Sequence, residues 1–525
     1  SFDYFAKSNG AYDYYDYKEH QTYIDAIANI NKHFGKISLA ANVGYSYSDY
    51  ASLTRGYGGN LILVPNKFSL NNIAPTDGKI REDGGGSKVR NVAAFASAEI
   101  GYKSMLYLTL TGRNDWNSRL VNSSEESFFY PSIGMSAIVS EMTKLPSFIS
   151  YLKVRGSYTE VGSPVSRSGM TPGTITTPIV GGSLKSTDIY PFTDYKAERT
   201  KSYEFGLTAR FWKKLSFDFT WYKSNTFNQT FIGELPESSG YKAVYLQAGN
   251  VENRGIEMSL GYTENFGGVQ WNSSLVYSKN VNEIKEMVKD YHHPLSPKPI
   301  NIPEVSKDNG RVLLKVGGTI NDIYARKVLA KDNQGFVNVS PSGGMSLETV
   351  EPIYLGKTTP DFTMGWNNTF TYKNFGLSFL VNARFGGVVT SSTQALLDRF
   401  GVSKASADAR DAGGVMLPNQ GLYDAKKYYT LVATGENDLA GYYTYSATNI
   451  RIQEFTLSYK FNSRWFNNIV KDLTLSFVAT NPWMIYCKAP FDPELTASTG
   501  TYGQGNDYFM QPSLRSYGFN IKFKF

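Results

Sequence analysis

The sequence predicts an all-β protein, a transmembrane antiparallel β-barrel to which this chain contributes about fifteen strands. Three observations lead to this fold class. Apolar and polar residues alternate with a period of two along the whole chain, tight connections alternate with long ones, and no run of 18 apolar residues occurs. The alternation is typical of strands whose two faces meet different surroundings, and the missing apolar run excludes a transmembrane helix.

Each strand is predicted from an apolar set that alternates with small or polar residues. In the first clear case, Ile37, Leu39, Ala41 and Val43 alternate with Ser38, Ala40 and Asn42. Each apolar set covers about the 9–11 residues that a tilted strand needs to cross a bilayer. The predicted strands are 22–33, 36–48, 91–101, 104–113, 129–140, 149–160, 200–211, 214–225, 253–263, 269–281, 361–373, 375–386, 449–461, 471–481 and 515–525.

The connections between these strands are of two kinds. The short ones lie around residues 33–36, 101–104, 211–214, 266–268 and 373–375. The long, polar ones cover 49–90, 114–128, 161–199, 226–252, 282–360, 387–448 and 482–514. Short turns at one end and long loops at the other are typical of an outer-membrane barrel, with periplasmic turns and extracellular loops. A soluble β-sandwich, the alternative for a single strand, would not show this alternation.

Composition agrees with a barrel and excludes other classes. Aromatic residues make up 15% of the 525 residues and charged residues 19%. Mean hydropathy is only −0.33, as expected where half of each strand faces water. The single cysteine, Cys487, excludes an internal disulfide framework. No tract is dense in lysine and arginine, so nucleic-acid binding is not predicted.

Two irregularities carry further predictions. In 449–461, Ile450 and Ile452 follow one register whereas Phe455 and Leu457 follow the other, which predicts a β-bulge near Gln453 and Glu454. A closed bacterial barrel normally has an even number of strands, so fifteen strands predict further N-terminal strands outside this chain.

Eight segments, in order along the chain, resemble the SusC-like TonB-dependent transporters of the Bacteroidota outer membrane. They are T-G-R-N-D-W-N-S-R (111–119), F-Y-P-S-I-G (129–134), L-K-V-R-G-S-Y-T-E-V-G (152–162), E-R-T-K-S-Y-E-F-G-L (198–207), G-N-V-E-N-R-G-I-E-M (249–258), L-G-K-T-T-P-D-F-T-M-G-W (355–366), A-T-N-P-W (479–483) and F-D-P-E (491–494). The terminal Y-G-F-N-I-K-F-K-F belongs to the same set.

The resemblance implies that residues 1–525 are the C-terminal part of one transporter barrel of about 22 strands. The family's plug and its TonB-contacting segment have no counterpart in this chain. The resemblance further implies active import of an oligosaccharide or oligopeptide, a SusD-like surface lipoprotein as a lid, and energy supplied through the TonB complex. A passive porin or a surface adhesin, built as a similar barrel in the outer-membrane lipid, is the alternative.

Charged residues on the polar faces of the strands are predicted to point into the lumen. They are Glu99, Lys153, Arg155, Glu204, Arg210, Asp218, Glu257 and Arg384. Charges at membrane depth need water or partners. The resemblance implies plug residues as their partners; a solvated wall is the alternative.

Substrate contacts are predicted in the tyrosine-rich loops at 11–18, 426–430, 441–445 and 501–509. The preferred residues, in the last long loop, are Asp492, Tyr502, Asp507 and Tyr508. Interfacial girdles and packing between loops are the alternative roles for these tyrosines.

No catalytic, metal or cofactor site is predicted. The sequence lacks a G-x-S-x-G nucleophile elbow. The adjacent His292 and His293 lie in a proline-rich stretch without converging ligands, so they are interpreted as surface histidines.

The last strand carries a prediction of its own. Its alternating residues Tyr517, Phe519, Ile521, Phe523 and Phe525 resemble the C-terminal signal that the barrel-assembly machinery reads. Simple burial of these aromatic side chains at the membrane interface is the alternative.

Overall fold

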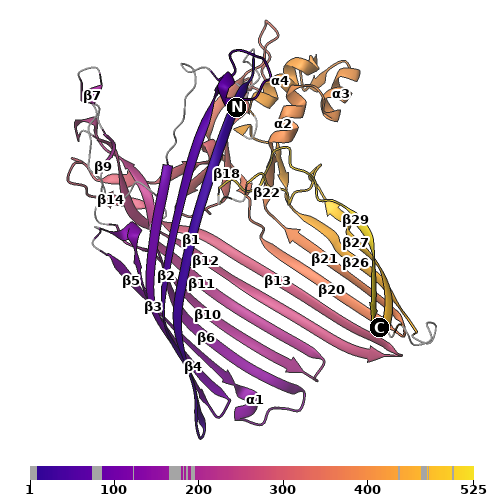
Figure 1. Ribbon diagram of the computed structural model, residues 1–525. Helices are drawn as coiled ribbons and strands as arrows, with labels where there is room; N and C mark the ends of the chain where they lie inside the picture. Colours follow the sequence, from indigo (N-terminus) through magenta and orange to yellow (C-terminus); the bar gives the residue numbers. More distant parts are fainter. Residues whose placement is uncertain are drawn as a thin grey trace.

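The computed structural model describes residues 9–73, 85–121, 123, 125–164, 179–180, 183–184, 187–190, 195–239, 241–435, 438–462, 470, 472–498, 500 and 502–524. Fifteen consecutive antiparallel strands form one curved sheet (Figure 1). These strands are β1 (Ala11–Phe34), β2 (Ile37–Asn60), β3 (Gly85–Tyr102), β4 (Leu106–Asn117), β5 (Ser127–Ile138), β6 (Ile149–Ser163), β10 (Glu198–Phe211), β11 (Leu215–Glu234), β12 (Tyr241–Phe266), β13 (Val269–Glu286), β20 (Phe362–Tyr372), β21 (Phe375–Phe385), β26 (Asn449–Phe461), β27 (Asp472–Cys487) and β29 (Ser516–Lys524). A sixteenth strand, β9 (Thr187–Tyr190), pairs in parallel with β12.

All fifteen predicted strands are therefore confirmed, but several predicted boundaries were wrong. β1 and β2 each have 24 residues, about twice the length that a bilayer requires. The tyrosine-rich segment 11–18, predicted as a loop, is the extracellular part of β1, where it pairs with β2. Continued pairing above the membrane satisfies the backbone polar groups of both strands, and a rule based on bilayer thickness cannot anticipate it.

The short connections form tight turns at one end of the sheet, as predicted. The turn between β10 and β11 places Trp212 and Lys213 at φ values of 50° and 60°. Gly35, between β1 and β2, has a φ of 59°. Turns with such positive φ angles have a twist that matches that of the flanking strands. The connection between β5 and β6 instead contains the short helix α1 (Val139–Met142).

The predicted β-bulge is confirmed. On β26, Ile452 pairs with Val381 and Glu454 pairs with Leu380, which leaves Gln453 as the extra residue. Because of this extra residue, the strand keeps an apolar outer face on both sides of the irregularity.

The long connections, predicted as loops, contain folded elements of their own. The 282–360 segment forms β14 (Val288–Tyr291) with β15 (Ile300–Ile302), and β16 (Glu304–Lys307), β17 (Val312–Lys315), β18 (Asp322–Leu329) and β19 (Leu347–Lys357) as a four-stranded sheet. The 387–448 segment holds β22 (Val388–Ser391), α2 (Ser392–Arg399), α3 (Lys404–Asp411), β23 (Val415–Leu417), β24 (Gly421–Tyr423), α4 (Ala425–Gly435) and β25 (Thr444–Ser446). Shorter elements are β7 (Ile179–Val180), β8 (Ser183–Leu184), β28 (Asn506–Asp507), and 3-10 turns at Leu70–Asn72, Ser118–Leu120, Glu237–Ser239 and Asp308–Gly310.

These elements gather at the extracellular end of the sheet, where the helices lie above the strands (Figure 1). The tyrosines at 426–430, predicted in a loop, lie in α4. Tyr428, Val432 and Leu439 form a buried apolar cluster with Ala395 of α2. The hydroxyl of Tyr443 donates to Asp398 at 3.0 Å. This extracellular region has a packed core, whereas the outer face of the sheet stays exposed, with Phe205 at 50% and Trp221 at 40%.

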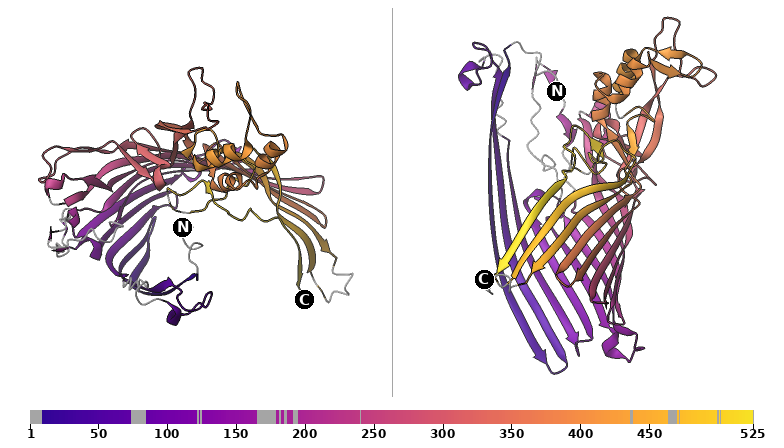
Figure 2. Two further views of the ribbon diagram at one scale, coloured as in Figure 1. Left: turned by 90° about the horizontal axis from the view of Figure 1, so that it is seen from above. Right: turned by 90° about the vertical axis from the view of Figure 1, so that its right-hand side faces the viewer.

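The sheet is an open arc when it is seen from the extracellular end (Figure 2). Within the described residues, β1 is hydrogen-bonded to β2 alone and β29 to β27 alone, so each leaves one edge without a strand partner. The helices that the structure describes are all too short or too polar to cross a membrane.

Candidate functional site

The inner face of the sheet carries polar side chains whose strands hold them side by side. Arg155 of β6 lies across β10 and reaches β11, where its guanidinium is 3.1 Å from a carboxylate oxygen of Asp218. It also donates to the hydroxyls of Thr208, at 3.0 Å, and Thr220, at 2.6 Å. Glu204 is more distant, at 4.0 Å. Three of the predicted lumen residues, Arg155, Glu204 and Asp218, therefore form one charged group.

Gly206 makes this arrangement possible. The residue pairs with Arg155 on the neighbouring strand. A Cβ atom at Gly206 would lie 2.4 Å from the Arg155 guanidinium carbon, far inside van der Waals contact. The glycine thus leaves the space through which the arginine side chain crosses β10.

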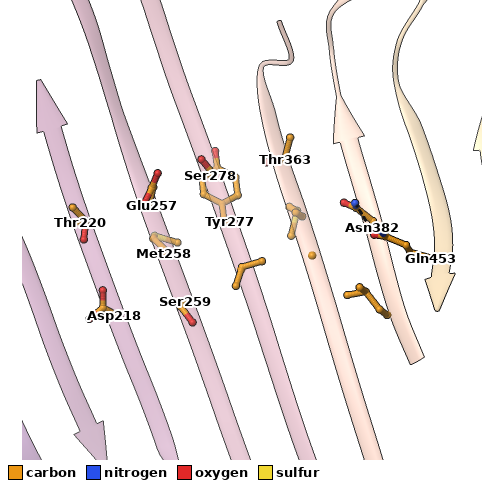
Figure 3. A pocket seen from close by; sticks show the side chains of 14 residues that line it. Asp218, Thr220, Glu257, Met258, Ser259, Tyr277, Ser278, Thr363, Asn382 and Gln453 are labelled. Atoms are coloured by element: carbon orange, nitrogen blue, oxygen red, sulfur yellow. Dashed lines mark hydrogen bonds between the residues drawn. The ribbon is translucent and has the colours of Figure 1, made fainter. Parts of the chain in front are cut away.

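A cavity of about 480 Å³ lies on the same inner face, next to Asp218 (Figure 3). Pairing across four strands brings together Thr220, Glu257, Ser278 and Thr363 at this level. Asn382 and the bulged Gln453 complete the wall and are joined by a hydrogen bond of 3.1 Å. The lining contains two carboxylates, Asp218 and Glu257, and no lysine or arginine. It therefore offers hydrogen-bond acceptors and negative charge to whatever occupies the lumen.

The other predicted lumen residues lie outside this group. Glu99 is on β3, and Arg210, near the periplasmic end of β10, lies over the ring of Tyr151 at 5.8 Å. Arg384 is half-buried and donates to the backbone carbonyl of Thr358, so a connection on the extracellular side covers it. The structure brings together four of the eight predicted residues, Arg155, Glu204, Asp218 and Glu257. It leaves Glu99, Lys153 of β6, Arg210 and Arg384 outside this group.

The predicted substrate residues of the last long connection lie in different environments. Asp492 accepts hydrogen bonds from Arg451, at 2.7 Å and 3.2 Å, and from Ser513. Burial raises the pKa of the Asp492 carboxyl, but the hydrogen bonds from Arg451 and Ser513 outweigh burial and hold the pKa below its usual value. Asp492 thus anchors the connection to β26.

Asp507 is also a structural partner. It is buried in β28 and accepts a hydrogen bond of 2.7 Å from the Ser391 hydroxyl. Its neighbour Tyr508 is exposed, with its ring 5.5 Å from that of Phe509. Tyr502 packs against the buried cluster that contains Val251, Ile284 and Val312, and this burial raises its pKa. Of the four residues, Tyr508 has the side chain most open to a ligand.

The sequence analysis missed two polar groups. Arg451 is buried and holds both Asp492 and Glu494. On the inner face of β4, Asp115 is buried and contacts Arg113 at 2.8 Å, Asn91 at 2.8 Å and the Tyr130 hydroxyl. The quoted segments 111–119, 129–134 and 491–494 contain most of these residues. Their alternation with apolar residues could have placed Arg113 and Asp115 on the inner face, but no pattern reveals their partners.

The terminal strand β29 is exposed along its whole length. Tyr517 and Phe519 lie beside Phe477 of β27, with ring centroids 6.2 Å and 5.7 Å apart. Phe525 lies outside the described residues. The assembly role of this strand stays a prediction.

A sheet of tilted strands with an apolar outer face, a polar inner face and tight turns at one end defines the wall of an outer-membrane β-barrel. The chain belongs to the family described as TonB dependent receptor-like, beta-barrel, whose family model matches residues 1–481. It is similar to TonB-dependent receptor P3 of Formosa agariphila, at 23% identity over 94% of this chain and 51% of that protein. TonB-dependent receptor SusC of Bacteroides thetaiotaomicron is 25% identical over 50% of this chain and 26% of its own length.

Among solved structures, the fold resembles a chain of the RagAB peptide importer in its open-open state. The TM-score is 0.74 at 16% identity, and the match covers 98% of this chain and 56% of that chain. The closed-closed state gives a TM-score of 0.71. The predicted membership of the TonB-dependent receptor family of the outer membrane, with SusC among its similar proteins, is confirmed by the family model. This chain spans about half the length of the P3 receptor and of the RagAB chain.

Proposed function

We propose that the chain forms part of the wall of an active importer that takes up an oligomeric nutrient, an oligopeptide or an oligosaccharide, across the outer membrane. The observation that carries the proposal is the polar inner face, where the Arg155–Asp218 pair adjoins an acidic cavity. A lumen lined in this way suits a hydrated, hydrogen-bonding cargo and a plug that moves against the wall.

The extracellular elements support import rather than passive diffusion. The helices α2 and α4 and the four-stranded sheet of β16–β19 stand above the strands and have a packed core of their own. This folded extracellular region gives a surface on which a SusD-like lipoprotein would act as a lid. The name of the RagAB peptide importer is consistent with a transport role, and catalysis has no part in the proposal.

We further propose that the open edges of β1 and β29 are bridged by additional strands of the same barrel, about seven if the total is about 22. A plug inside that barrel would contact the wall at Arg155, Glu204, Asp218 and Glu257. The plug would also carry the segment that TonB pulls, so that force on it opens a path along the inner face.

The test is uptake by cells that express the complete receptor with its lipoprotein partner. Fluorescent oligopeptides and oligosaccharides too large for porins are supplied to cells with and without TonB. The proposal requires accumulation of at least one substrate class that disappears without TonB. Accumulation that persists without TonB would establish the passive porin, and binding without any accumulation would establish the adhesin.

A further inference from the structure

A band of charged side chains runs along the outer face of the sheet, on the extracellular side of the apolar belt. On five neighbouring strands, an apolar or aromatic outward residue is followed, two positions nearer the extracellular end, by a charged residue. The pairs are Tyr158 and Glu160 on β6, Tyr203 and Lys201 on β10, Trp221 and Lys223 on β11, Ile256 and Arg254 on β12, and Tyr277 and Lys279 on β13. Residues two apart on a strand share a face, so the charged members also point away from the lumen.

Two cations of this band, Lys223 and Arg254, contact a buried carboxylate. The Glu252 carboxylate is surrounded by Lys223 at 2.9 Å, Arg254 at 3.6 Å and Lys285 at 3.8 Å. The Glu252 side chain is only 6% exposed, whereas those of Lys223, Arg254 and Lys285 are 41%, 52% and 33% exposed. Glu283, which is 30% exposed, also pairs with Arg254 and Lys285. Three cations and two carboxylates leave this group with one net positive charge, carried by its more exposed members.

The same layering occurs on a second part of the sheet. Asp49 of β2 is 16% exposed and lies 3.4 Å from Lys88 and 3.2 Å from Arg90 on β3. These two cations are 61% and 51% exposed. They also lie just beyond outward-facing apolar residues, Tyr47 and Val92. Two separate groups of strands therefore place exposed cations around a less exposed carboxylate.

We propose that this band binds the phosphate groups of lipopolysaccharide, the phosphorylated glycolipid of the outer leaflet. The cations lie directly above the aromatic side chains that mark the membrane interface, which is the level of the lipid headgroups. Arginine and lysine are the side chains that suit phosphate, the former through paired hydrogen bonds and the latter as a point charge. Basic groups at this depth attract anionic lipid headgroups.

A neighbouring cavity provides space for the sugar part of such a lipid. It has a volume of about 1100 Å³, and Lys285, an ion-pair partner of Glu252, belongs to its lining. The lining adds Lys289 and Lys315, together with Phe227 and Tyr291. It also contains Glu286 and Glu304, so lysines outnumber carboxylates by three to two. The cavity thus offers cations for phosphate groups and aromatic side chains for sugar rings. It lies next to the ion-paired group around Glu252.

The test measures lipopolysaccharide retained by the complete receptor after purification from outer membranes in mild detergent. The double variant Arg254→Gln, Lys279→Gln removes two exposed cations and leaves Glu252 paired with Lys223 and Lys285. The control is Lys214→Gln, Lys373→Gln, which makes the same change of charge at the periplasmic end; Lys214 is 51% exposed and ion-paired. Retention should fall about fivefold per cation removed in the first variant and stay unchanged in the control. Equal retention by both variants would overturn the proposal.

A second measurement uses the unmodified receptor, so it does not depend on the folding of variants. Detergent-solubilised receptor is titrated with lipid A, with phosphatase-treated lipid A, with phosphatidylethanolamine and with inorganic phosphate. The proposal requires the tightest binding for lipid A and weakening when its phosphates are removed. Equal binding of lipid A with and without phosphate, or equal binding of the phospholipid, would contradict it. Inorganic phosphate bound as tightly as lipid A would show a free-anion site and would also overturn it.

Discussion

At the scale of single residues, the ion pair of Arg451 and Asp492 joins strand β26 to the connection between β27 and β29. Their side chains are 6% and 8% exposed, and the arginine also contacts Glu494 at 3.3 Å. Loss of one partner leaves a buried charge without compensation, and that is far more costly than the loss of an exposed pair. The pair therefore fixes the connection between β27 and β29 on the sheet.

The pKa of Asp492 leads to a prediction about pH. Because its folded pKa is lower than its unfolded value, near 3.9, Asp492 stabilises the docked connection above that pH. The stabilisation is lost as the pH falls through the folded pKa. We expect amide hydrogen exchange of residues 488–498, corrected for intrinsic rates, to rise below about pH 4. Asp492→Asn should show the faster exchange already at pH 7.

The matched control for this prediction is Asp408→Asn. Asp408 also pairs with a cation, Lys404, at 2.7 Å, but its side chain is 60% exposed. An exposed pair contributes little, so this variant should exchange like the unmodified protein. If Asp492→Asn also exchanged normally at pH 7, Asp492 would not hold the connection.

At the scale of elements, β26 shows how one extra residue preserves two faces. Gln453 and Glu454 both lie on the inner side of the bulge, with Ile452 and Phe455 outward on either side. Deletion of Gln453 should restore regular alternation and leave every other residue on its present face. We expect this variant to reach the outer membrane at nearly the normal level, measured by immunoblotting of membrane fractions.

Deletion of Thr456, three positions away, is the control on the same strand. The strand can absorb this loss only by turning Phe455 inward and Glu454 toward lipid, where a charge is expensive. We expect much less inserted protein. Equal insertion of the two deletion variants would show that the bulge does not set the face of each residue.

The terminal strand β29 yields a second prediction at this scale. If its alternating aromatics are an assembly signal, deletion of Phe525 or Phe525→Asp should lower the amount inserted far more than the thermal stability of inserted molecules. An unpaired strand offers its edge for pairing with another sheet, which is the physical basis of such recognition. Normal insertion with a lowered melting temperature would support simple burial, which is worth about 1.5–3 kcal/mol.

At the scale of the whole molecule, an introduced arginine should have different effects on the two faces of the sheet. Phe379 lies outward, with its ring 5.8 Å from that of Trp366, whereas Asn382 lines the lumen cavity. Phe379→Arg should destabilise the barrel by about 2–4 kcal/mol near the bilayer midplane. Asn382→Arg should fold normally, although it changes the inner wall. Refolding in lipid vesicles gives both free energies of unfolding, and equal values would contradict the two-faced sheet.

The sequence alone determined the strands, their order, the tight turns, the bulge at Gln453 and the face on which each charge lies. All of these follow from a period of two, which is a local property because successive side chains point to opposite faces. The inward positions of Arg155, Asp218 and Glu257 were predictable for this reason.

Only the tertiary structure decided which residues meet. Arg155 and Asp218 are 63 positions apart, and their contact depends on strand register, on a third strand between them and on the absence of a side chain at Gly206. Arg451 and Asp492 meet because a connection folds back on the sheet. The helices of the 387–448 segment and the extracellular length of β1 likewise depend on packing above the membrane. Such contacts join parts of the chain that are far apart in the sequence. A local periodicity cannot predict them, so only the tertiary structure shows them.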